Sequence, residues 1–334
     1  MTAPLLISRS EIDDTQWNKL VEKSSQQVIY GYTWYLDIVS PHWKALVWPS
    51  AEEYRIVMPL PVKQKWLMEV IQQPLFCQYL GLFSLEEISE IHFNGFLKVL
   101  SLHYSYISSY SFHPENSALL KSVLMNFPLF KTTQNTTFWL SLADSYWQIN
   151  AGFTVDRKNN IKRAANENWQ IEKSDDPKEL IELFKNNHVT QISGGVDANA
   201  WVMFEKLYEV IKNEAVAELW YAMKNNEIHA GVLFVKTGQQ VIYLFNAADG
   251  EGRKGNARTF LLNAYFQQNA DREVVFDFES PEIKSIASFY KSFGSDTKPY
   301  YIVRKNDLPF PFRQIQNWRI KKLVSTRQAP FEDS

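Results

Sequence analysis

Two carboxylates lie close together near the end of a short apolar segment. Asp277 and Glu279 close a predicted strand over Glu273–Phe278. Because side chains alternate along a strand, both carboxylates are expected on one face. Such a pair can bind an ammonium group or remove its proton, and we take both residues as candidate catalytic groups. The alternative is a solvated strand end, or a cap for the helix predicted to begin at Ser280.

A glycine-rich loop, Asp249–Gly255, is predicted to lead into a helix from Asn256 to about Gln268. The N–H groups that open a helix point outward and the helix dipole favours anions, so this loop can hold a phosphate group. The alternative is an ordinary polar turn between a hairpin and a helix. The candidate residues for binding a phosphate-bearing substrate that donates a chemical group are Asn246, Gly252, Arg253, Lys254, Gly255 and Asn256.

Four positive charges fall within seven residues at positions 157–163. On a helix Lys158 and Lys162 are one turn apart, with Arg157 near the same side, and such a face can hold phosphates. A solvated basic helix face is the alternative. The candidate acceptor-binding or phosphate-binding residues are Lys63, Lys65, Arg157, Lys158, Asn160, Lys162, Arg163 and Lys291.

One tyrosine is a candidate general acid. Tyr290 lies one turn after Ile286 on a predicted helix, where it either donates a proton to a leaving group or packs as an amphipathic side chain. The six histidines show no metal-ligand spacing and there is one cysteine, so we expect no metal site. The aromatic residues between Tyr30 and Trp48 can line a pocket for a sugar or a base, but we favour a place in the core.

The elements that must position these residues are clearest in the second half. Hydrophobic periodicity predicts β-α-α-β-β-β-α-β-α-β. The expected strands are Trp169–Glu172, Val216–Met223, Ile228–Lys236, Gln240–Asn246, Glu273–Phe278 and Tyr300–Val303. Asp175-Asp176-Pro177 and Asp197 are predicted to begin the first two helices, and the last helix is expected to end near Gly294.

The first half is predicted to have a similar order. The expected strands are Leu5–Ile7, Lys44–Val47, Tyr54–Val62, Leu67–Tyr79, Tyr104–Tyr110 and Phe138–Leu142. The expected helices are Asp14–Lys23, Thr33–Val39, Glu86–Ser101 and Asn116–Met125. Residues Asp144–Asn168 are expected to be mainly helical and to connect the two halves. The similar order suggests two copies of one fold.

Several segments resemble FemABX-type transferases. Residues 157–164 (RKNNIKRA) resemble an R-x-x-N-I-x-x-A segment, and residues 275–294 resemble the C-terminal signature that ends in I-A-x-F-K-x-x-F-G. Met58–Pro61 and Gln78–Gly81 resemble N-terminal segments of the same group. The predicted order of elements is that of the GNAT acyltransferase fold. The resemblance implies a mixed α+β chain of two GNAT-like lobes, 1–148 and 149–305, with 306–334 returning to the first lobe.

The resemblance also implies a reaction. FemABX proteins move an amino acid from aminoacyl-tRNA to an amine on a cell-wall peptide precursor, and GNAT enzymes move an acyl group from acyl-CoA to an amine. Where the FemABX signature has Lys, this chain has Tyr290, with Lys291 one residue later. Tyr290 is similar in place to the GNAT tyrosine that protonates the departing CoA thiolate. The donor is therefore left open between acyl-CoA and aminoacyl-tRNA, with no tightly bound cofactor.

Composition limits the remaining functional classes. The 334 residues suit two domains, and 45% hydrophobic residues supply real cores. The net charge of −2 argues against a globally basic DNA-binding protein, although it leaves room for a local tRNA contact. We expect no signal peptide, no membrane span and a cytoplasmic location. The predicted function is an N-acyltransferase acting on a small-molecule or peptide amine; the alternative is a non-catalytic binding protein that retains the fold.

Overall fold

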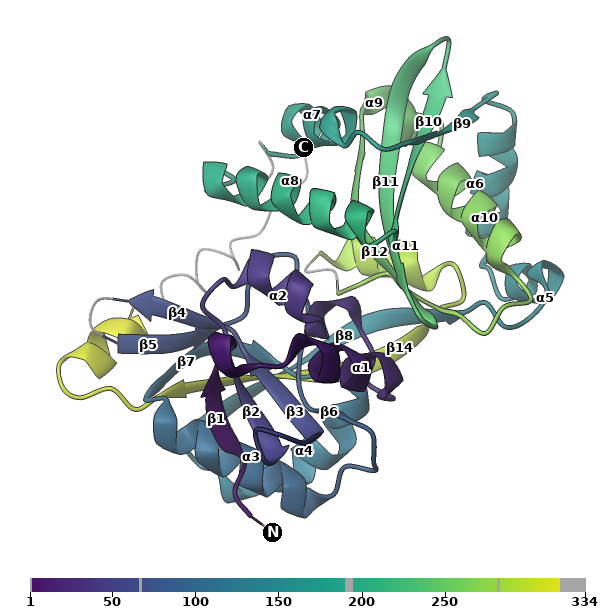
Figure 1. Cartoon of the computed structure of the whole chain (residues 1–334). Coiled ribbons are helices and arrows are strands. Elements are labelled where there is room, and N and C mark those ends of the chain that lie inside the picture. Colours follow the sequence, from purple (N-terminus) through teal and green to yellow (C-terminus); the bar gives the residue numbers. More distant parts are fainter. Residues whose placement is uncertain (1, 66–67, 190–194, 281–282, 319–334) are drawn as a thin grey trace. The chain divides into compact units, whose positions relative to one another are not determined.

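A computed structural model describes residues 2–65, 68–189, 195–280 and 283–318 (Figure 1). The chain forms two compact units. Unit 1 combines Met1–Gln26, Ser40–Gln134 and the residues from Tyr300 onward, and unit 2 combines Gln27–Val39 with Asn135–Pro299. Segments 27–39 and 135–148 thus belong to unit 2, whereas they fall within the lobe proposed for residues 1–148. The lobe boundary itself stays a prediction.

Unit 1 contains two sheets. The first is antiparallel and has the order β1-β2-β3-β6, with β1 (Leu5–Ser8), β2 (Lys44–Pro49), β3 (Tyr54–Leu60) and β6 (Phe83–Ser84). The second is mixed and has the order β4-β5-β7-β14, with β4 (Val62–Lys65), β5 (Met68–Gln72), β7 (Tyr106–Ser111) and β14 (Asp296–Asn306). The helices are α1 (Asp14–Lys23), α3 (Glu90–His103) and α4 (Ser117–Val123).

Three predicted elements of unit 1 are shorter than expected. The strand predicted to run to Val62 ends at Leu60, because Pro61 interrupts the ladder and β4 begins after it. The strand predicted over 67–79 is only β5, because the chain turns at a proline and at Phe76, whose φ is +56°; Leu67 lies outside the described residues. Helix α3 begins at Glu90 and not at Glu86, because Ser89 caps it.

Unit 2 is built on one mixed sheet in the order β8-β13-β12-β11-β10-β9. Its strands are β8 (Phe130–Ser141), β9 (Gln170–Ser174), β10 (Ala217–Lys224), β11 (Glu227–Thr237), β12 (Gln240–Ala248) and β13 (Val275–Asp277). Only β12 and β13 pair in parallel among the described pairs of this sheet. Its helices are α2 (Thr33–Val39), α5 (Tyr146–Ala151), α6 (Val155–Ala165), α7 (Lys178–Asn187), α8 (Ala198–Asn213), α9 (Gly250–Lys254), α10 (Ala257–Asn269) and α11 (Lys284–Lys291).

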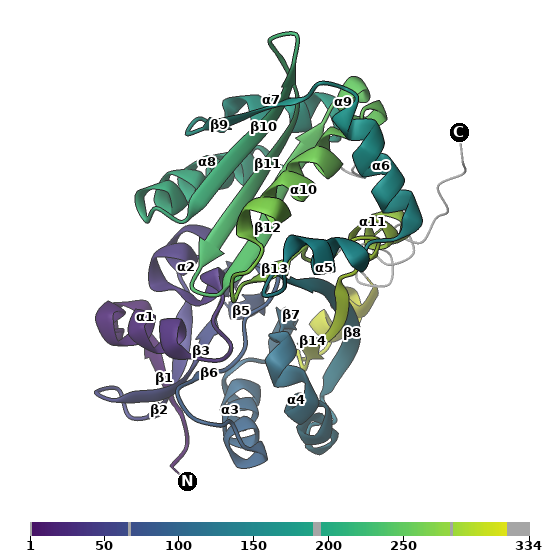
Figure 2. The same cartoon turned by 90° about the vertical axis from the view of Figure 1, so that its right-hand side faces the viewer.

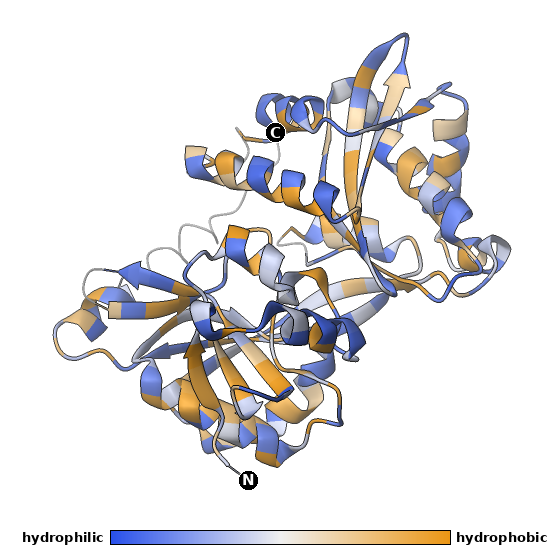
Figure 3. Cartoon of the chain, viewed as in Figure 1, coloured by the Kyte–Doolittle hydropathy of each residue, from blue (hydrophilic) through white to orange (hydrophobic). Residues whose placement is uncertain are grey.

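Helices cover both faces of the central strands of unit 2. Figure 2 shows α10 across one face of β10–β12, with α7 and α8 behind the same strands. Strand β11 is buried at seven consecutive positions from His229 to Val235, as expected of a strand covered on both sides. Helix α8 alternates between hydrophobic and hydrophilic residues, so one of its sides can face the sheet (Figure 3).

The predicted order of elements in the second half of the chain is confirmed, with one addition. The prediction of a loop at Asp249–Gly255 is wrong, because Gly250–Lys254 forms the short helix α9. Helix α11 begins at Lys284 rather than at Ser280; Pro281 and Glu282 lie outside the described residues. Strands β8 and β14 are several residues longer than predicted and β13 is shorter, ending at Asp277.

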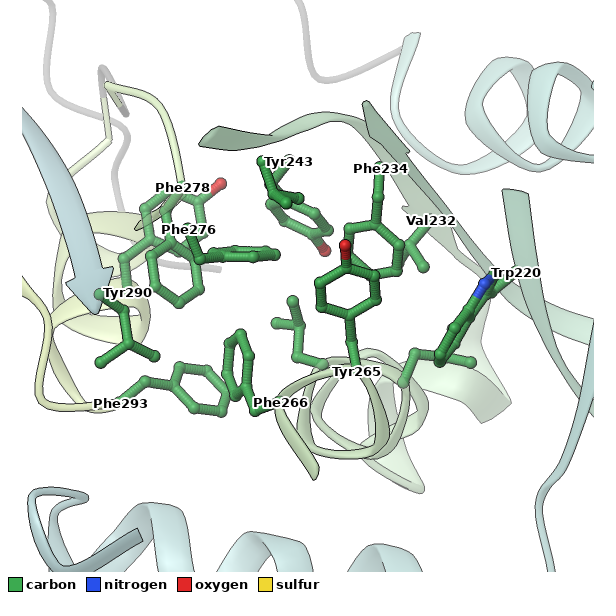
Figure 4. Packing of buried hydrophobic residues seen from close by; sticks show 14 of the residues in the cluster. Trp220, Val232, Phe234, Tyr243, Tyr265, Phe266, Phe276, Phe278, Tyr290 and Phe293 are labelled. Atoms are coloured by element: carbon green, nitrogen blue, oxygen red, sulfur yellow. The ribbon is translucent and has the colours of Figure 1, made fainter. Parts of the chain in front are cut away.

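An aromatic cluster fills the side of the unit 2 sheet that faces α10. Phe276 and Phe278 pack against Phe266 of α10, with ring centroids 5.0 and 6.0 Å away (Figure 4). Tyr290 of α11 stacks on Phe278 at 4.9 Å. The predicted core position of the aromatic residues between Tyr30 and Trp48 is confirmed in part, since Tyr30, Tyr35 and Trp43 are fully buried. The strand that carries Asp277 is therefore packed against aromatic rings on one side.

Candidate functional site

The two strands beside the candidate carboxylates separate within unit 2. Strand β12 pairs with β13 only from Gln240 to Ile242, opposite Val275 to Asp277. Beyond that point β12 continues to Ala248, whereas the segment that follows β13 turns at Glu279, whose φ is +64°. The residues that follow this separation come from β12, from the turn after β13 and from α11.

The carboxylates of Asp277 and Glu279 lie at this turn, although not on one strand face. Asp277 is fully buried and its Oδ1 accepts a hydrogen bond from Thr137 Oγ1 (2.6 Å) and another from the backbone N–H of Glu279 (2.8 Å). The predicted shared strand face is therefore corrected to a side-chain-stabilised turn. Because Asp277 is buried, the solvated strand end that we considered as an alternative does not apply to it.

Glu279 is the more unusual of the two carboxyl groups. The hydroxyl of Tyr30, from the segment 27–39 of unit 2, donates a hydrogen bond to its Oε1. Burial raises the pKa of Glu279 to about 8, and the nearby charge of Asp277 adds to this, while the bond from Tyr30 lowers it. A carboxyl group with a pKa near 8 can take a proton from an ammonium group far better than an ordinary glutamate can.

Tyr290 lies next to these carboxylates in the aromatic cluster. Its side chain is buried, and burial, together with Tyr243 and Glu279, raises its pKa far above 10, so the hydroxyl keeps its proton. Arg258 acts in the opposite direction on the same hydroxyl. The charges of the two carboxyl groups and of Arg258 therefore act on the pKa of the Tyr290 hydroxyl in opposite directions. The structure shows the packed tyrosine, one of the two alternatives from the sequence; its role as a proton donor stays a prediction.

The glycine-rich segment has a structural role that the sequence did not indicate. A Cβ on Gly252 would lie 2.2 Å from the backbone oxygen of His229, and one on Gly255 would lie 2.5 Å from the Trp169 ring. Asp249 caps α9 by accepting the N–H of Gly252 (2.7 Å), and its other oxygen pairs with His229 Nδ1 (2.8 Å). These two glycines allow close packing of α9 on β11 and Trp169.

The helix opening predicted to hold an anion lies at α10. Its N-cap Asn256 has a φ of +54° and offers no side-chain cap. Within the described parts of the chain, no acceptor contacts the N–H groups of Ala257, Arg258 and Thr259. Arg253 of the predicted loop instead donates to the carbonyl of Ala248 (2.7 Å), and Lys254 is exposed. The backbone N–H groups without a described acceptor therefore belong to residues 257–259, which follow the glycine-rich segment.

The basic residues at 157–163 do not share one surface. Arg157 points inward, is 6% exposed, and donates to Ser292 and Thr259. Lys162 and Arg163 are exposed, and Arg163 bonds to Asn160 on its own helix (3.3 Å). Other candidates lie elsewhere: Lys158 donates to the carbonyl of Ala151, Lys291 is exposed at the end of α11, and Lys63 and Lys65 lie on β4 of unit 1.

Arg258 is a site residue that the sequence analysis missed. Its Nη1 donates a hydrogen bond to Asn246 Oδ1 (2.8 Å). Arg258 therefore holds in place Asn246, one of the residues predicted to bind the donor substrate. His188 accepts a hydrogen bond from the N–H of Ala248, and burial together with Arg258 and Arg253 lowers its pKa. An arginine in the first turn after a Gly-x-Ala sequence was the signal that could have identified it.

No group of three or more His, Cys, Asp or Glu side chains in the described residues could hold a metal ion. No described helix has the length and apolar character needed to span a bilayer.

Comparison with known proteins identifies the fold. No family model and no curated protein matches the sequence. Among solved structures, FemX has a TM-score of 0.63 at 12% identity, over 91% of this chain and 98% of that one. A tandem GNAT protein from the clavulanic acid biosynthesis pathway has a TM-score of 0.53 at 10% identity, over 92% and 99%. L-PGS from Bacillus licheniformis has a TM-score of 0.51 at 12% identity, over 92% and 96%. The chain therefore has the FemABX/GNAT-like acyltransferase fold.

Proposed function

We propose that this chain is an N-acyltransferase, which moves an acyl or aminoacyl group from a donor to an amine. The observation that carries the proposal is the carboxyl group of Glu279, whose pKa is raised to about 8 beside Asp277 and Tyr30. An amine must lose a proton before it attacks a carbonyl carbon, and a base with such a pKa suits this step.

The reaction assigns a role to each group. Glu279 accepts the proton of the ammonium group, and the free amine attacks the carbonyl carbon of the donor. A C–N bond forms and the C–S bond of a thioester, or the C–O bond of an aminoacyl ester, breaks. The first proton on Glu279 passes to solvent, and the nitrogen loses a second proton to Glu279 as the amide forms. The hydroxyl of Tyr290 supplies a proton to the departing thiolate or alkoxide, and the second proton held by Glu279 then restores that hydroxyl through solvent.

The donor is acyl-CoA or aminoacyl-tRNA, bound as a substrate and not as a resident cofactor. The unfilled N–H groups at the start of α10 suit a donor phosphate, and the candidates Asn246, Gly252, Arg253, Lys254, Gly255 and Asn256 surround that helix start or precede it. The tandem GNAT protein from the clavulanic acid biosynthesis pathway was solved without AcCoA, and this link to AcCoA supports testing that donor first.

The acceptor is proposed to be an amine on a small molecule or peptide, such as a cell-envelope or peptidoglycan precursor. The likeness to FemX supports this choice, and a cytoplasmic location would place the chain with such precursors and with tRNA. Lys63, Lys65, Lys158, Asn160 and the exposed residues Lys162, Arg163 and Lys291 stay candidates for phosphate groups of the acceptor or of tRNA.

The test is acyl transfer to a panel of primary amines, with acetyl-CoA and with charged tRNA in separate arms. Glu279→Gln should lower kcat by about 10²–10⁴-fold while donor binding by calorimetry is unchanged. Glu273→Gln, an exposed glutamate on the same segment, is the matched control and should retain activity. Transfer by wild type that is equally fast in Glu279→Gln would refute Glu279 as the base.

A non-catalytic binding protein is the second candidate. It is favoured by the packing of α9, whose glycines contact His229 and Trp169 and leave no open loop at Gly250–Lys254. Binding of an amine or donor in every arm, with transfer in none, would support this alternative. Tyr290→Phe separates the two: it should reduce transfer without reducing donor affinity if the chain is an enzyme.

A further inference from the structure

Two arginines in unit 2 lie near each other without a carboxylate partner. Arg157 comes from α6 and Arg258 from the first turn of α10. Their mutual repulsion contributes to lowering the pKa of Arg157, which burial lowers most. Within the described parts of the chain, neither guanidinium lies within 4.0 Å of an Asp or Glu oxygen.

The surroundings of Arg157 are unusual for a structural arginine. Its side chain is 6% exposed, and its guanidinium carbon lies 4.3 Å from the ring centroid of Phe289 and 4.5 Å from that of Phe293. Its hydrogen-bond acceptors are two neutral hydroxyls, Ser292 Oγ at 2.9 Å and Thr259 Oγ1 at 2.6 Å. Stacking and neutral hydroxyls hold the planar group in place but do not compensate its charge.

Arg258 faces the same aromatic ring from another element. Its guanidinium carbon is 5.8 Å from the centroid of Phe289, and its one described hydrogen bond goes to the neutral amide of Asn246. A guanidinium carries five N–H donors, so most of those on Arg258 are left for another acceptor. Two guanidinium groups thus lie near one ring, and planar cations of this kind bind the oxygens of phosphates and carboxylates well.

We propose that Arg157 and Arg258 form a binding site for an oxyanion, a phosphate or a carboxylate, carried by a ligand of this chain. Removing two positive charges from water without a counter-ion is costly, and a bound anion would relieve that cost. The start of α10, which carries Arg258, adds a favourable dipole. If the proposed acyl transfer is correct, the substrate carries this anion close to its reacting end, because Arg258 also influences Tyr290.

The test measures binding of simple anions to the full chain and needs no acyl transfer. Inorganic phosphate and acetate are titrated separately at constant ionic strength, followed by calorimetry and by the melting temperature. We expect saturable binding of at least one anion and a rise in melting temperature. Arg258→Gln should weaken that binding by tenfold or more, and Arg258→Lys should weaken it less.

The control is Arg272→Gln, which changes an exposed arginine of unit 2 whose guanidinium donates to Asn269 and should leave anion affinity unchanged. Arg258 is tested first because it is partly exposed, whereas replacing the buried Arg157 can disturb folding. Preference for phosphate or for acetate identifies the chemical class of the ligand group. No saturable binding of either anion, or equal affinity in wild type and Arg258→Gln, would overturn the proposal, whether or not acyl transfer is found.

Discussion

At the scale of single residues, two carboxyl groups two positions apart have different surroundings. Asp277 is fully buried and accepts hydrogen bonds from Thr137 and from the Glu279 backbone. Glu279 is partly exposed and accepts a hydrogen bond from the hydroxyl of Tyr30, and its pKa is raised to about 8. Neighbouring acids with different environments can take different parts in one reaction, so we assign the proton transfer to Glu279 and the positioning of the turn to Asp277.

The raised pKa of Glu279 predicts a dependence of stability on pH. Between 4.5, the ordinary pKa of a glutamate, and about 8, the folded chain holds a proton that the unfolded chain has released. The contribution of Glu279 to the free energy of unfolding is therefore fully present below pH 4.5 and is lost as the pH rises through 8. We expect the free energy of unfolding of wild type relative to Glu279→Gln to fall by about 1–3 kcal/mol from pH 5 to pH 8.5.

Urea denaturation of both proteins across this pH range measures the difference. The glutamine keeps the size of the side chain and has no titrating group, so its curve reports all other titrations. Parallel curves for the two proteins would show that the pKa of Glu279 is not raised in the folded state.

The hydroxyl of Thr137 predicts a cost for losing one hydrogen bond to a buried carboxylate. Thr137→Val keeps the shape of the side chain but removes the donor to Asp277, and both residues are fully buried. We expect a loss of about 1–3 kcal/mol in the free energy of unfolding. Thr137→Ser keeps the hydroxyl and should lose about 1 kcal/mol for its missing methyl group. A valine variant as stable as wild type would contradict this role.

At the scale of elements, the sequence predicted those with a strong internal pattern. Helix α1 and helix α2 have the predicted bounds, and Asp197 caps α8 through the N–H of Asn199 as expected. The failures fall where long-range packing decides. The glycine-rich segment gave no sign of forming α9, because its glycines are needed for contacts with His229 and Trp169, which are distant in sequence.

The candidate site was predictable in part for the same reason. Residue types and spacing identified Asp277, Glu279 and Tyr290, which the structure brings together. Tyr30, however, is 249 positions from Glu279 in the sequence, and no local pattern links the two. The inward position of Arg157 was also missed, because a charged residue on a helix is normally expected in solvent.

The packing of α9 predicts opposite results for two similar substitutions. Gly252→Ala would place a Cβ 2.2 Å from the backbone oxygen of His229, so we expect a loss of about 1–3 kcal/mol in the free energy of unfolding. Gly250→Ala meets no atom within 4 Å and should be neutral or stabilising by up to about 1 kcal/mol. Thermal and urea unfolding measure both. A Gly252→Ala variant as stable as Gly250→Ala would mean that α9 does not pack closely on β11.

At the scale of the whole molecule, the path of the chain limits how it can be divided. Unit 2 is assembled from Gln27–Val39 and Asn135–Pro299, so the chain passes between the units at residues 26, 39, 134 and 299. The first of these segments carries Tyr30 and Leu36, both fully buried, and its helix α2 contacts α8. A fragment cut at the predicted lobe boundary therefore lacks part of the core of unit 2.

We expect the fragment 149–305 to lose cooperative unfolding, because each large buried side chain that is deprived of its cover costs about 1.5–3 kcal/mol. A second fragment, which joins residues 27–39 to residues 135–299 through a long Gly/Ser linker, restores the whole of unit 2 and should unfold cooperatively. Near-ultraviolet circular dichroism during heating distinguishes the two. If the fragment 149–305 melts cooperatively at the temperature of the joined fragment, residues 27–39 contribute little, and the site must be complete without Tyr30.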